Sequence, residues 1–193
     1  MTAENRKLTD RIIIALVLLL AVSLFTAGES LSATAKEIDA SVDVALDRFY
    51  KDVKGAKEFA KSAKALLVLP GVIKGGFVFA GEYGEGAMRI GGKTVDYYNI
   101  ASASFGLTIG AQKKDIIIAF MTDEALKKFR ATQGWEAGVD GNLALWDIGA
   151  GTRLDTTTMK DPIVAFVFDS KGFMADLSLK GAKITKLDKS KEK

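Results

Sequence analysis

The N-terminal part of the chain shows a helical pattern of apolar and polar positions between residues 38 and 65. At 100° per residue the apolar side chains fall on one stripe, which consists of Ile38, Val42, Ala45, Leu46, Phe49, Val53, Ala56, Phe59, Ala60 and Ala63. Aspartates and lysines cover the opposite side. Gly55 is positioned to bend or split the helix. Leu69-Pro70-Gly71 is expected to end the segment.

This helix has two interpretations. It suits an interfacial helix, in which Phe49 and Phe59 enter lipid while Lys57 and Lys61 attract anionic headgroups. It also suits a helix that packs on the protein's own sheet. Acidic residues along the same helix weaken the membrane interpretation, so we favour the packed helix.

From Val72 onward the chain is rich in glycine and alternates with the period of a β-strand. In residues 73–83 apolar side chains alternate with Lys74 and Glu82, and the glycine-rich stretch 81–86 is interpreted as a tight turn or bulge. Gly91-Gly92 predicts a hairpin turn, and Thr122 a helix N-cap. The remaining predicted elements are strands at 87–90, 93–100, 102–111, 115–121, 135–149 (one or two strands), 162–169, 172–179 and 183–187, turns at 112–114 and 170–172, and a helix over 122–132.

These elements predict one α+β domain. An N-terminal amphipathic helix is packed on a glycine-rich, mostly antiparallel flattened barrel or sandwich of about eight strands, with one short inserted helix. Closure of the sheet is favoured because it removes exposed strand edges.

The first residues have the layout of a secretory signal peptide. Residues 1–11 are polar, 12–25 are almost entirely apolar, and Ala33-Thr34-Ala35 resembles a cleavage site. The alternative is an uncleaved membrane anchor, but the apolar run is shorter than the roughly 20 residues of a spanning helix. We therefore expect a signal peptide at 1–35, a domain at 36–188 and a basic tail at 189–193. Either interpretation predicts an exported protein, periplasmic or associated with the cell envelope.

The composition excludes several kinds of chemistry. The chain has neither histidine nor cysteine, so a Ser-His-Asp triad, a Cys-His pair and a cysteine- or histidine-ligated zinc site are excluded. No spacing of carboxylates or serines singles out a catalytic group, so we expect no enzyme activity, no metal and no cofactor. The net charge of +3 is too small to imply nucleic-acid binding.

Several blocks along the chain resemble the SYLF-domain family of lipid-binding proteins. They are LVLPGVIKGG at 67–76, GEYGEG at 81–86, GGKTV at 91–95, SFG at 104–106, IAFMT at 118–122, GWE at 134–136, DTTT at 155–158 and FVFDSKG at 166–172. Because the blocks occur in order over roughly residues 38–188, the resemblance is specific, and the chain looks like an exported bacterial member.

The resemblance implies lipid binding in general and leaves the headgroup open. The expected partner is an anionic phospholipid, met either as a membrane surface or as a single lipid in an apolar cavity. Lys74, Arg89 and Lys93 are candidate ligands for lipid phosphates if they share one face of the sheet; otherwise they belong to a solvated outer face. The alternative function is a structural or assembly factor of the cell envelope that binds another protein.

Overall fold

The computed structural model describes residues 33–76, 79–105, 110–148, 154, 161–172 and 179–189. Residues Thr34–Lys193 form one compact unit and Met1–Ala33 form another. The expected signal peptide or anchor therefore falls almost entirely outside the described residues. Within the described ranges, no helix combines the length and apolarity needed to cross a membrane.

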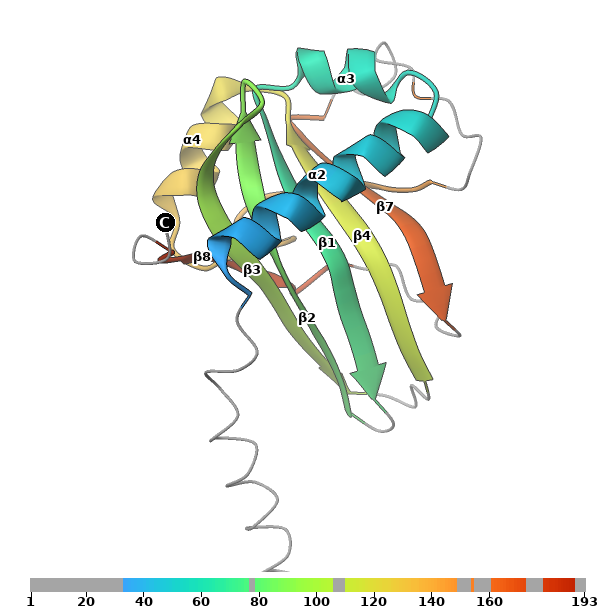
Figure 1. Ribbon diagram of the computed structural model, residues 1–193. Helices are drawn as coiled ribbons and strands as arrows, with labels where there is room; N and C mark the ends of the chain where they lie inside the picture. Colours follow the sequence, from blue (N-terminus) through green and yellow to red (C-terminus); the bar gives the residue numbers. More distant parts are fainter. Residues whose placement is uncertain are drawn as a thin grey trace, which may run out of the picture. The chain divides into compact units, whose positions relative to one another are not determined.

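In the described part of the chain, eight strands form one curled sheet, which confirms the predicted α+β class (Figure 1). The strand order is β5-β8-β3-β2-β1-β4-β7-β6, and every pair is antiparallel except β6 with β7. The strands are β1 Ala65–Gly76, β2 Phe79–Ile90, β3 Lys93–Phe105, β4 Gly110–Phe120, β5 Trp135–Glu136, β6 Ala144–Asp147, β7 Ile163–Gly172 and β8 Lys183–Leu187.

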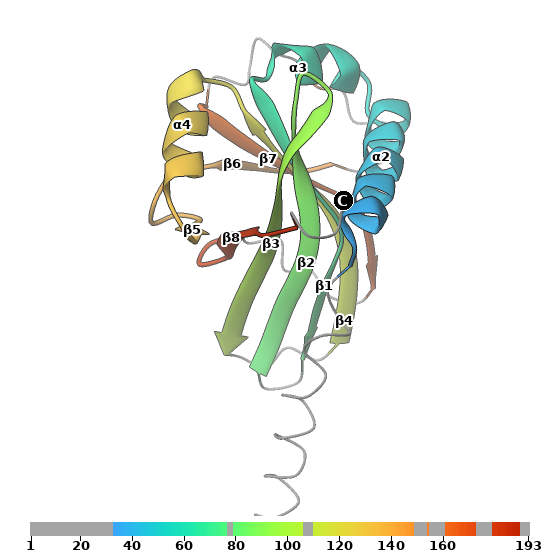
Figure 2. The same ribbon diagram turned by 60° about the vertical axis from the view of Figure 1, so that its left-hand side comes forward.

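Three helices accompany the sheet in the described residues: α2 Ala35–Asp52, α3 Ala56–Ser62 and α4 Asp123–Ala131. The helical pattern over 38–65 thus forms two helices, which separate at Gly55, where the sequence had placed a bend or break. Helices α2 and α3 lie on one face of the sheet, which we call the outer face. Helix α4 lies on the opposite side, at what we call the inner face (Figure 2). Thr122 caps α4 as predicted, since its side chain accepts a hydrogen bond from the Ala125 N–H.

The phenylalanines of the helical stripe pack inside the protein. Phe49 and Phe59 are fully buried, and their ring centroids lie 5.5 Å and 5.0 Å from that of Phe166 on β7. The structure therefore shows the helix packed on its own sheet, the interpretation we favoured.

Strand β1 contains a bulge at Pro70-Gly71, where the sequence had predicted the end of a helical segment. Its pairing with β4 shifts from Leu69↔Ile116 to Val72↔Lys114, so β1 holds one extra residue here. Proline is tolerated in this central strand because a bulge interrupts the ladder of hydrogen bonds. The Gly71 N–H instead donates to Asp115 Oδ1 at 2.7 Å.

The glycines at 81–86 form neither the predicted tight turn nor a bulge of their own. They lie within β2, and the pairing of β2 with β3 is regular from Phe79 to Met88. Gly86 sits beside the bulge of β1, and a Cβ atom there would come within 1.9 Å of the Val68 carbonyl oxygen. Glycine is therefore needed at this position because two backbones approach closely.

Other strand limits differ from the sequence prediction. The single strand predicted over 73–83 is divided between β1 and β2, and β4 and β7 run straight through the turns predicted at 112–114 and 170–172. Polar residues such as Gln112 and Lys114 resemble a turn in the sequence, but both are buried within the sheet. The strand predicted over 172–179 falls mostly outside the described residues. The Gly91-Gly92 hairpin and the strand at 183–187 are confirmed.

The two ends of the central strands differ in what they bury. We call the end of β1 and β2 near Gly76 and Phe79 the tip end. Away from it, the inner face carries an apolar core that includes Leu67, Met88 and Phe120. Toward the tip end, the inner face carries buried polar side chains instead, namely Lys74, Glu82, Gln112 and Lys114.

An ion pair crosses β1 on this inner face. Lys114 Nζ on β4 lies 3.1 Å from Glu82 Oε1 on β2, and the two side chains are 0% and 1% exposed. Two opposite charges in such a site stabilise each other, but either one alone would remain desolvated without compensation.

The helix cap at the start of α2 coincides with the expected cleavage site. The Glu37 N–H donates to Thr34 Oγ1 at 3.3 Å, and the Thr34 N–H donates back to Glu37 Oε2 at 2.8 Å. The Thr34 hydroxyl also donates to Glu37 Oε2 at 2.8 Å. The bond from the Thr34 N–H first, and the bond from its hydroxyl second, lower the pKa of Glu37. A chain that began at Lys36 would lack this cap.

Removing the cap hydroxyl tests its contribution. We expect Thr34→Ala to lower the free energy of unfolding by about 1 kcal/mol, as measured by denaturant titration of the full chain. Ser41→Ala, in the middle of the same helix, is the control and should cause no loss. Equal stability of Thr34→Ala and the parent would contradict the capping role.

Breaking the buried ion pair should be more costly. We expect Lys114→Met to lower the free energy of unfolding by about 3–5 kcal/mol, because Glu82 would stay buried without its partner. Lys113→Met, which alters the neighbouring exposed side chain on the same strand, should change it by less than about 0.5 kcal/mol. Similar losses in the two variants, measured by denaturant titration, would show that the pair contributes nothing specific.

Candidate functional site

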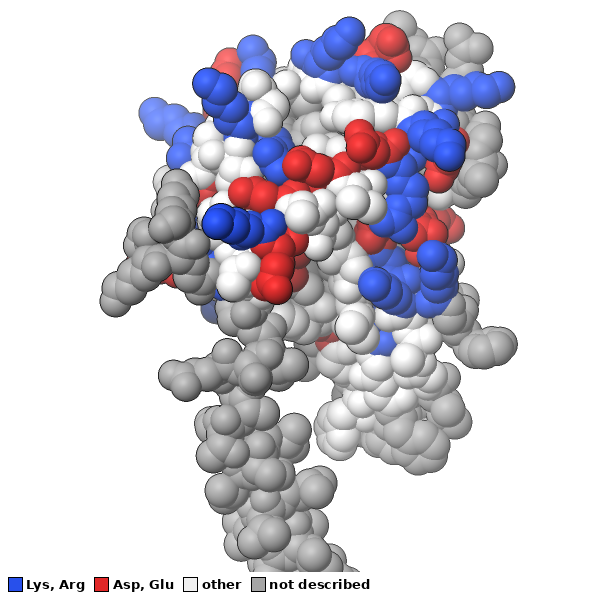
Figure 3. All heavy atoms as spheres, in the orientation of Figure 1, with Lys and Arg blue, Asp and Glu red and all other residues white. Residues whose placement is uncertain are grey.

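A groove of about 520 Å³ lies between α2, α3 and the turn that joins β2 to β3. We call it the basic groove. It is lined by Asp43, Leu46, Tyr50, Lys57, Ala60, Lys61, Ala63, Lys64, Ala65, Leu66, Arg89, Gly91 and Gly92. The lining holds four basic side chains against one acidic one, and Figure 3 shows basic side chains gathered over α3.

Helix α3 is oriented by Gly55 and by its own buried residues. Gly55 has a left-handed backbone (φ 82°), and a Cβ atom there would lie 2.6 Å from the carbonyl oxygen of Leu154. Glycine meets both requirements. Ala56 and Phe59 face the core, so Lys57 and Lys61, which are four residues apart and share one side of the helix, are left to line the groove.

Arg89 forms the sheet side of the groove, and aspartates hold it there. Its Nη2 atom lies 2.7 Å from Asp43 Oδ1 and 3.5 Å from Asp39 Oδ1. Asp39 also accepts hydrogen bonds from the hydroxyls of Thr94 at 2.6 Å and Tyr97 at 3.0 Å. Arg89 is therefore fixed in position beside the groove, with its charge largely offset by the two aspartates.

The lysines of the groove differ in their partners. Lys64 Nζ lies 3.3 Å from Asp123 on α4. Lys57 and Lys61 are exposed, and neither forms an ion pair or hydrogen bond with any described residue. These two ammonium groups carry the uncompensated charge of the groove.

Apolar surface lies next to these charges. Leu46 and Tyr50 from α2, Ala60 and Ala63 from α3 and its end, and Leu66 from β1 line the groove. Burial, with a smaller effect of Asp47, raises the pKa of Tyr50, so its ring stays neutral. The groove thus joins a cationic edge to an apolar floor, an arrangement that fits an amphipathic anion.

The structure brings together three of the residues proposed from the sequence. Lys57, Lys61 and Arg89 all line the basic groove. Lys93 is exposed directly after the Gly91-Gly92 turn but is not part of the lining.

The other three proposed residues are placed elsewhere. Lys74 is 4% exposed and lies on the inner face of the sheet toward the tip end, so the hypothesis that it shares an exposed face with Arg89 is wrong. Phe49 and Phe59 are buried against Phe166, so in this structure they cannot contact lipid. Their helical stripe carried no signal that separates a core contact from a membrane contact.

Sequence reasoning missed the floor of the groove. Leu46 and Tyr50 belong to the turns of α2 that face α3, and their position depends on the break at Gly55. That break is fixed by Leu154, which is remote in sequence and also donates its N–H to the Lys54 carbonyl at 2.8 Å. No local pattern contains this contact.

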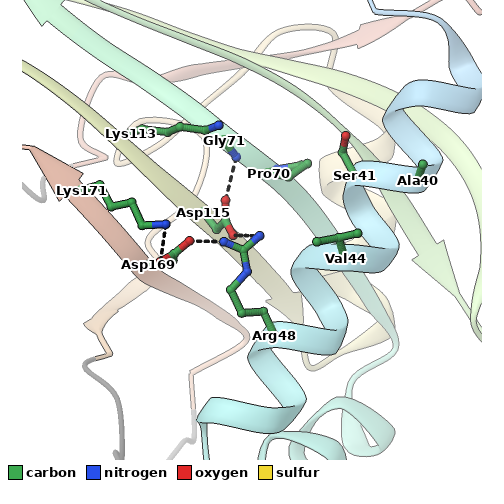
Figure 4. A pocket seen from close by; sticks show the side chains of 10 residues that line it. All are labelled: Ala40, Ser41, Val44, Arg48, Pro70, Gly71, Lys113, Asp115, Asp169 and Lys171. Atoms are coloured by element: carbon green, nitrogen blue, oxygen red, sulfur yellow. Dashed lines mark hydrogen bonds and ion pairs between the residues drawn. The ribbon is translucent and has the colours of Figure 1, made fainter.

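A second groove of the same volume, about 520 Å³, lies on the other side of α2, between that helix and β1, β4 and β7. We call it the Arg48 groove. Figure 4 shows the Arg48 guanidinium between Asp115 and Asp169, with Lys171 also reaching Asp169. Its lining holds three basic side chains against two aspartates, and Arg48 and Lys171 are paired with those aspartates. The Arg48 groove therefore has a smaller excess of positive charge for an anion than the basic groove has.

The described residues contain no group of three or more acidic, histidine or cysteine side chains that could hold a metal. The basic groove presents a binding surface, with cations at its edge and apolar side chains on its floor. A ligand-binding domain is the class of protein that this geometry fits.

The comparisons with known proteins agree with this class. Residues 101–193 match the model of the Ysc84 family, which is described as a Las17-binding protein actin regulator. This is the SYLF-domain family, so the resemblance is confirmed over residues 101–193. The family is one of binding domains and not of enzymes. No curated protein matches the chain. The residues that line the basic groove precede the matched range.

Proposed function

We propose that this protein binds an anionic phospholipid, holds its phosphate in the basic groove and catalyses no reaction on it. The observation that carries the proposal is the pair Lys57 and Lys61, two ammonium groups without partners among the described residues, beside Arg89 and above an apolar floor. Lipid binding is also what the SYLF resemblance implies.

The chemistry of a phospholipid matches the two parts of the groove. A phosphate diester carries one negative charge and oxygens that accept charge-assisted hydrogen bonds from lysine and arginine. The glycerol and the first methylenes of the acyl chains would lie on Leu46, Ala60, Ala63 and Leu66, where burial of apolar surface adds to the affinity. A small inorganic anion would use only the charged edge.

We also propose that this binding takes place in a bacterial cell envelope. The support is the sequence of the first 35 residues, which has the charged start, apolar middle and small-residue end of an export signal. A protein partner in the envelope is the alternative. The description of the Ysc84 family, which names a Las17-binding protein, is the observation that favours it.

Removing the two free charges tests the proposal. Monomeric short-chain phosphatidylglycerol is titrated into the full chain by calorimetry, with short-chain phosphatidylcholine as the comparison lipid. Each exposed lysine contact is worth up to about 1 kcal/mol, so we expect Lys57→Gln with Lys61→Gln to raise Kd for the anionic lipid by up to about 30-fold.

The control variant removes two lysines from outside the groove. Lys127→Gln with Lys128→Gln on α4 changes the net charge equally and should leave Kd within about twofold. Equal effects of the two double variants, or no binding of phosphatidylglycerol by the parent protein, would contradict the proposal and leave a protein partner as the function to pursue.

Removing the acidic residue of the groove should have the opposite effect. Asp43→Asn deletes the negative charge 2.7 Å from Arg89, so we expect Kd for short-chain phosphatidylglycerol to fall about fivefold at low salt and the gain to shrink as salt screens the charges. Asp147→Asn, an exposed change on β6, is the matched control. Weaker binding by Asp43→Asn would contradict this expectation and mean that losing the contact that holds Arg89 outweighs the repulsion removed.

A further inference from the structure

The outer face of the sheet carries exposed apolar side chains toward the tip end. Ile73 on β1 is 58% exposed, and Phe79 and Tyr83 on β2 are 73% and 43% exposed. Ala101 and Ala103 on β3 and Ala111 on β4 are exposed beside them. We call these six residues the apolar tip face. In Figure 3 an uncharged surface extends from below α2 toward this end of the sheet.

The inner face at the same level carries the charges. Lys74 on β1 and Glu82 on β2 directly follow or precede the outward-facing Ile73 and Tyr83, and Lys114 lies on the same inner face of β4. All three are at most 4% exposed. An antiparallel sheet with one wet face ordinarily directs polar side chains to water and apolar ones to the core. Here the sides are reversed, and ions are buried while a phenylalanine and an isoleucine face outward. This arrangement is expected where the outer face meets an apolar medium.

Lysines flank the apolar tip face at one level of the sheet. The register aligns Ile73 with Tyr83 and Tyr83 with Ala101. The same row continues to Lys113 and Lys171 on one side and to Lys183 on the other. All three lysines are exposed, although Lys171 also contacts Asp169 at 3.4 Å.

Beyond this row, toward the tip, the described outward-facing residues of β1 to β4 carry no charge: Gly75, Phe79, Gly81, Ala103 and Ala111. Tyr83 lies at the row itself, and its hydroxyl donates to Glu85 at 2.6 Å. The level of the lysines therefore separates a charged surface from an apolar one.

We propose that the apolar tip face enters the interfacial region of an anionic phospholipid bilayer, with the lysine row at the level of the headgroup phosphates. Lysine and tyrosine at such a boundary keep their polar ends at the headgroups while their stems and rings contact lipid. From Ile73 to the end of β1 the strand rises roughly 10 Å, which matches the depth of an interfacial segment, about 5–10 Å. The cations suit anionic lipid.

This inference does not depend on the basic groove, which lies at the opposite end of the same strands. Leu66 in the groove and Gly75 near the tip are separated by roughly 30 Å along β1. A bilayer that covers the tip face therefore leaves the groove open to a phospholipid from elsewhere. A protein with both contacts can hold two lipid surfaces at once.

Depth-dependent fluorescence quenching tests the inference. The full chain has no cysteine, so Phe79→Cys and Val139→Cys each accept a single environment-sensitive fluorophore; Val139 is 72% exposed and lies outside the tip face. Vesicles contain phosphatidylglycerol in phosphatidylcholine, with bromine on the acyl chains of a fraction of the lipid. We expect the fluorophore at position 79 to be quenched at least twofold and that at position 139 to be unaffected.

A double variant gives an independent readout. We expect Ile73→Ser with Phe79→Ser to weaken vesicle binding about tenfold or more, while Val95→Ser with Val139→Ser, which alters exposed valines elsewhere, leaves it unchanged. Both pairs are at the surface, so folding should be preserved, and circular dichroism checks it.

Quenching at position 79 is the deciding readout for the tip face, because the apolar run at 12–25 of the full chain could bind vesicles by itself. Sedimentation with vesicles but no quenching at position 79 overturns the inference, as does the absence of any vesicle binding. Neither outcome bears on the titration of the groove with monomeric lipid, and failure of that titration leaves the tip inference standing.

Discussion

One extra residue in the central strand β1 sets the direction of its side chains toward the tip end. Before the bulge, Leu67 and Leu69 face the inner core; after it, Val72 and Lys74 do, so Ile73 faces outward. The Gly71 N–H donates to Asp115, whose other oxygen lies 3.4 Å from Arg48 on α2. Arg48 in turn pairs with Asp169 on β7. The bulge, the helix and two neighbouring strands are thus held by one network, and without the extra residue Lys74 would face outward and Ile73 inward.

The bulge in β1 separates the sheet into two ends that present different surfaces. Away from the tip, both faces of the sheet are buried, the outer one under α2 and α3, and the break at Gly55 leaves lysines of α3 over a groove. Toward the tip, no described helix covers the outer face, and the charges lie inside as the Lys114–Glu82 pair. Successive side chains of a strand point to opposite faces of the sheet. Because Lys114, Glu82 and Lys74 point inward at this level, Ile73 and Tyr83 point outward. The ion pair stabilises the charges that this arrangement buries.

Elements governed by local pattern could be predicted from the sequence. The amphipathic stripe, the Thr122 cap, the Gly91-Gly92 turn and the strand at 183–187 depend on residues close in the chain. The bulge could not be predicted, because Pro70-Gly71 signals a break equally well, and only the distant Asp115 decides between them. The sequence placed Lys74 at the surface because lysine usually lies there, whereas its burial depends on pairing between three strands. For the site, the sequence identified Lys57, Lys61 and Arg89, but the apolar floor depends on the contact of Gly55 with Leu154.

We propose the groove between α2, α3 and the β2–β3 turn as the phospholipid site. This is tested by mapping backbone amide chemical shifts as monomeric short-chain phosphatidylglycerol is added to the isotope-labelled full chain. We expect shifts that cluster on residues 57–66 and 89–92, with saturation at a common Kd, and none at Arg48 or Asp169. Shifts confined to the Arg48 groove, or no shifts at a lipid concentration just below its micelle threshold, would contradict it.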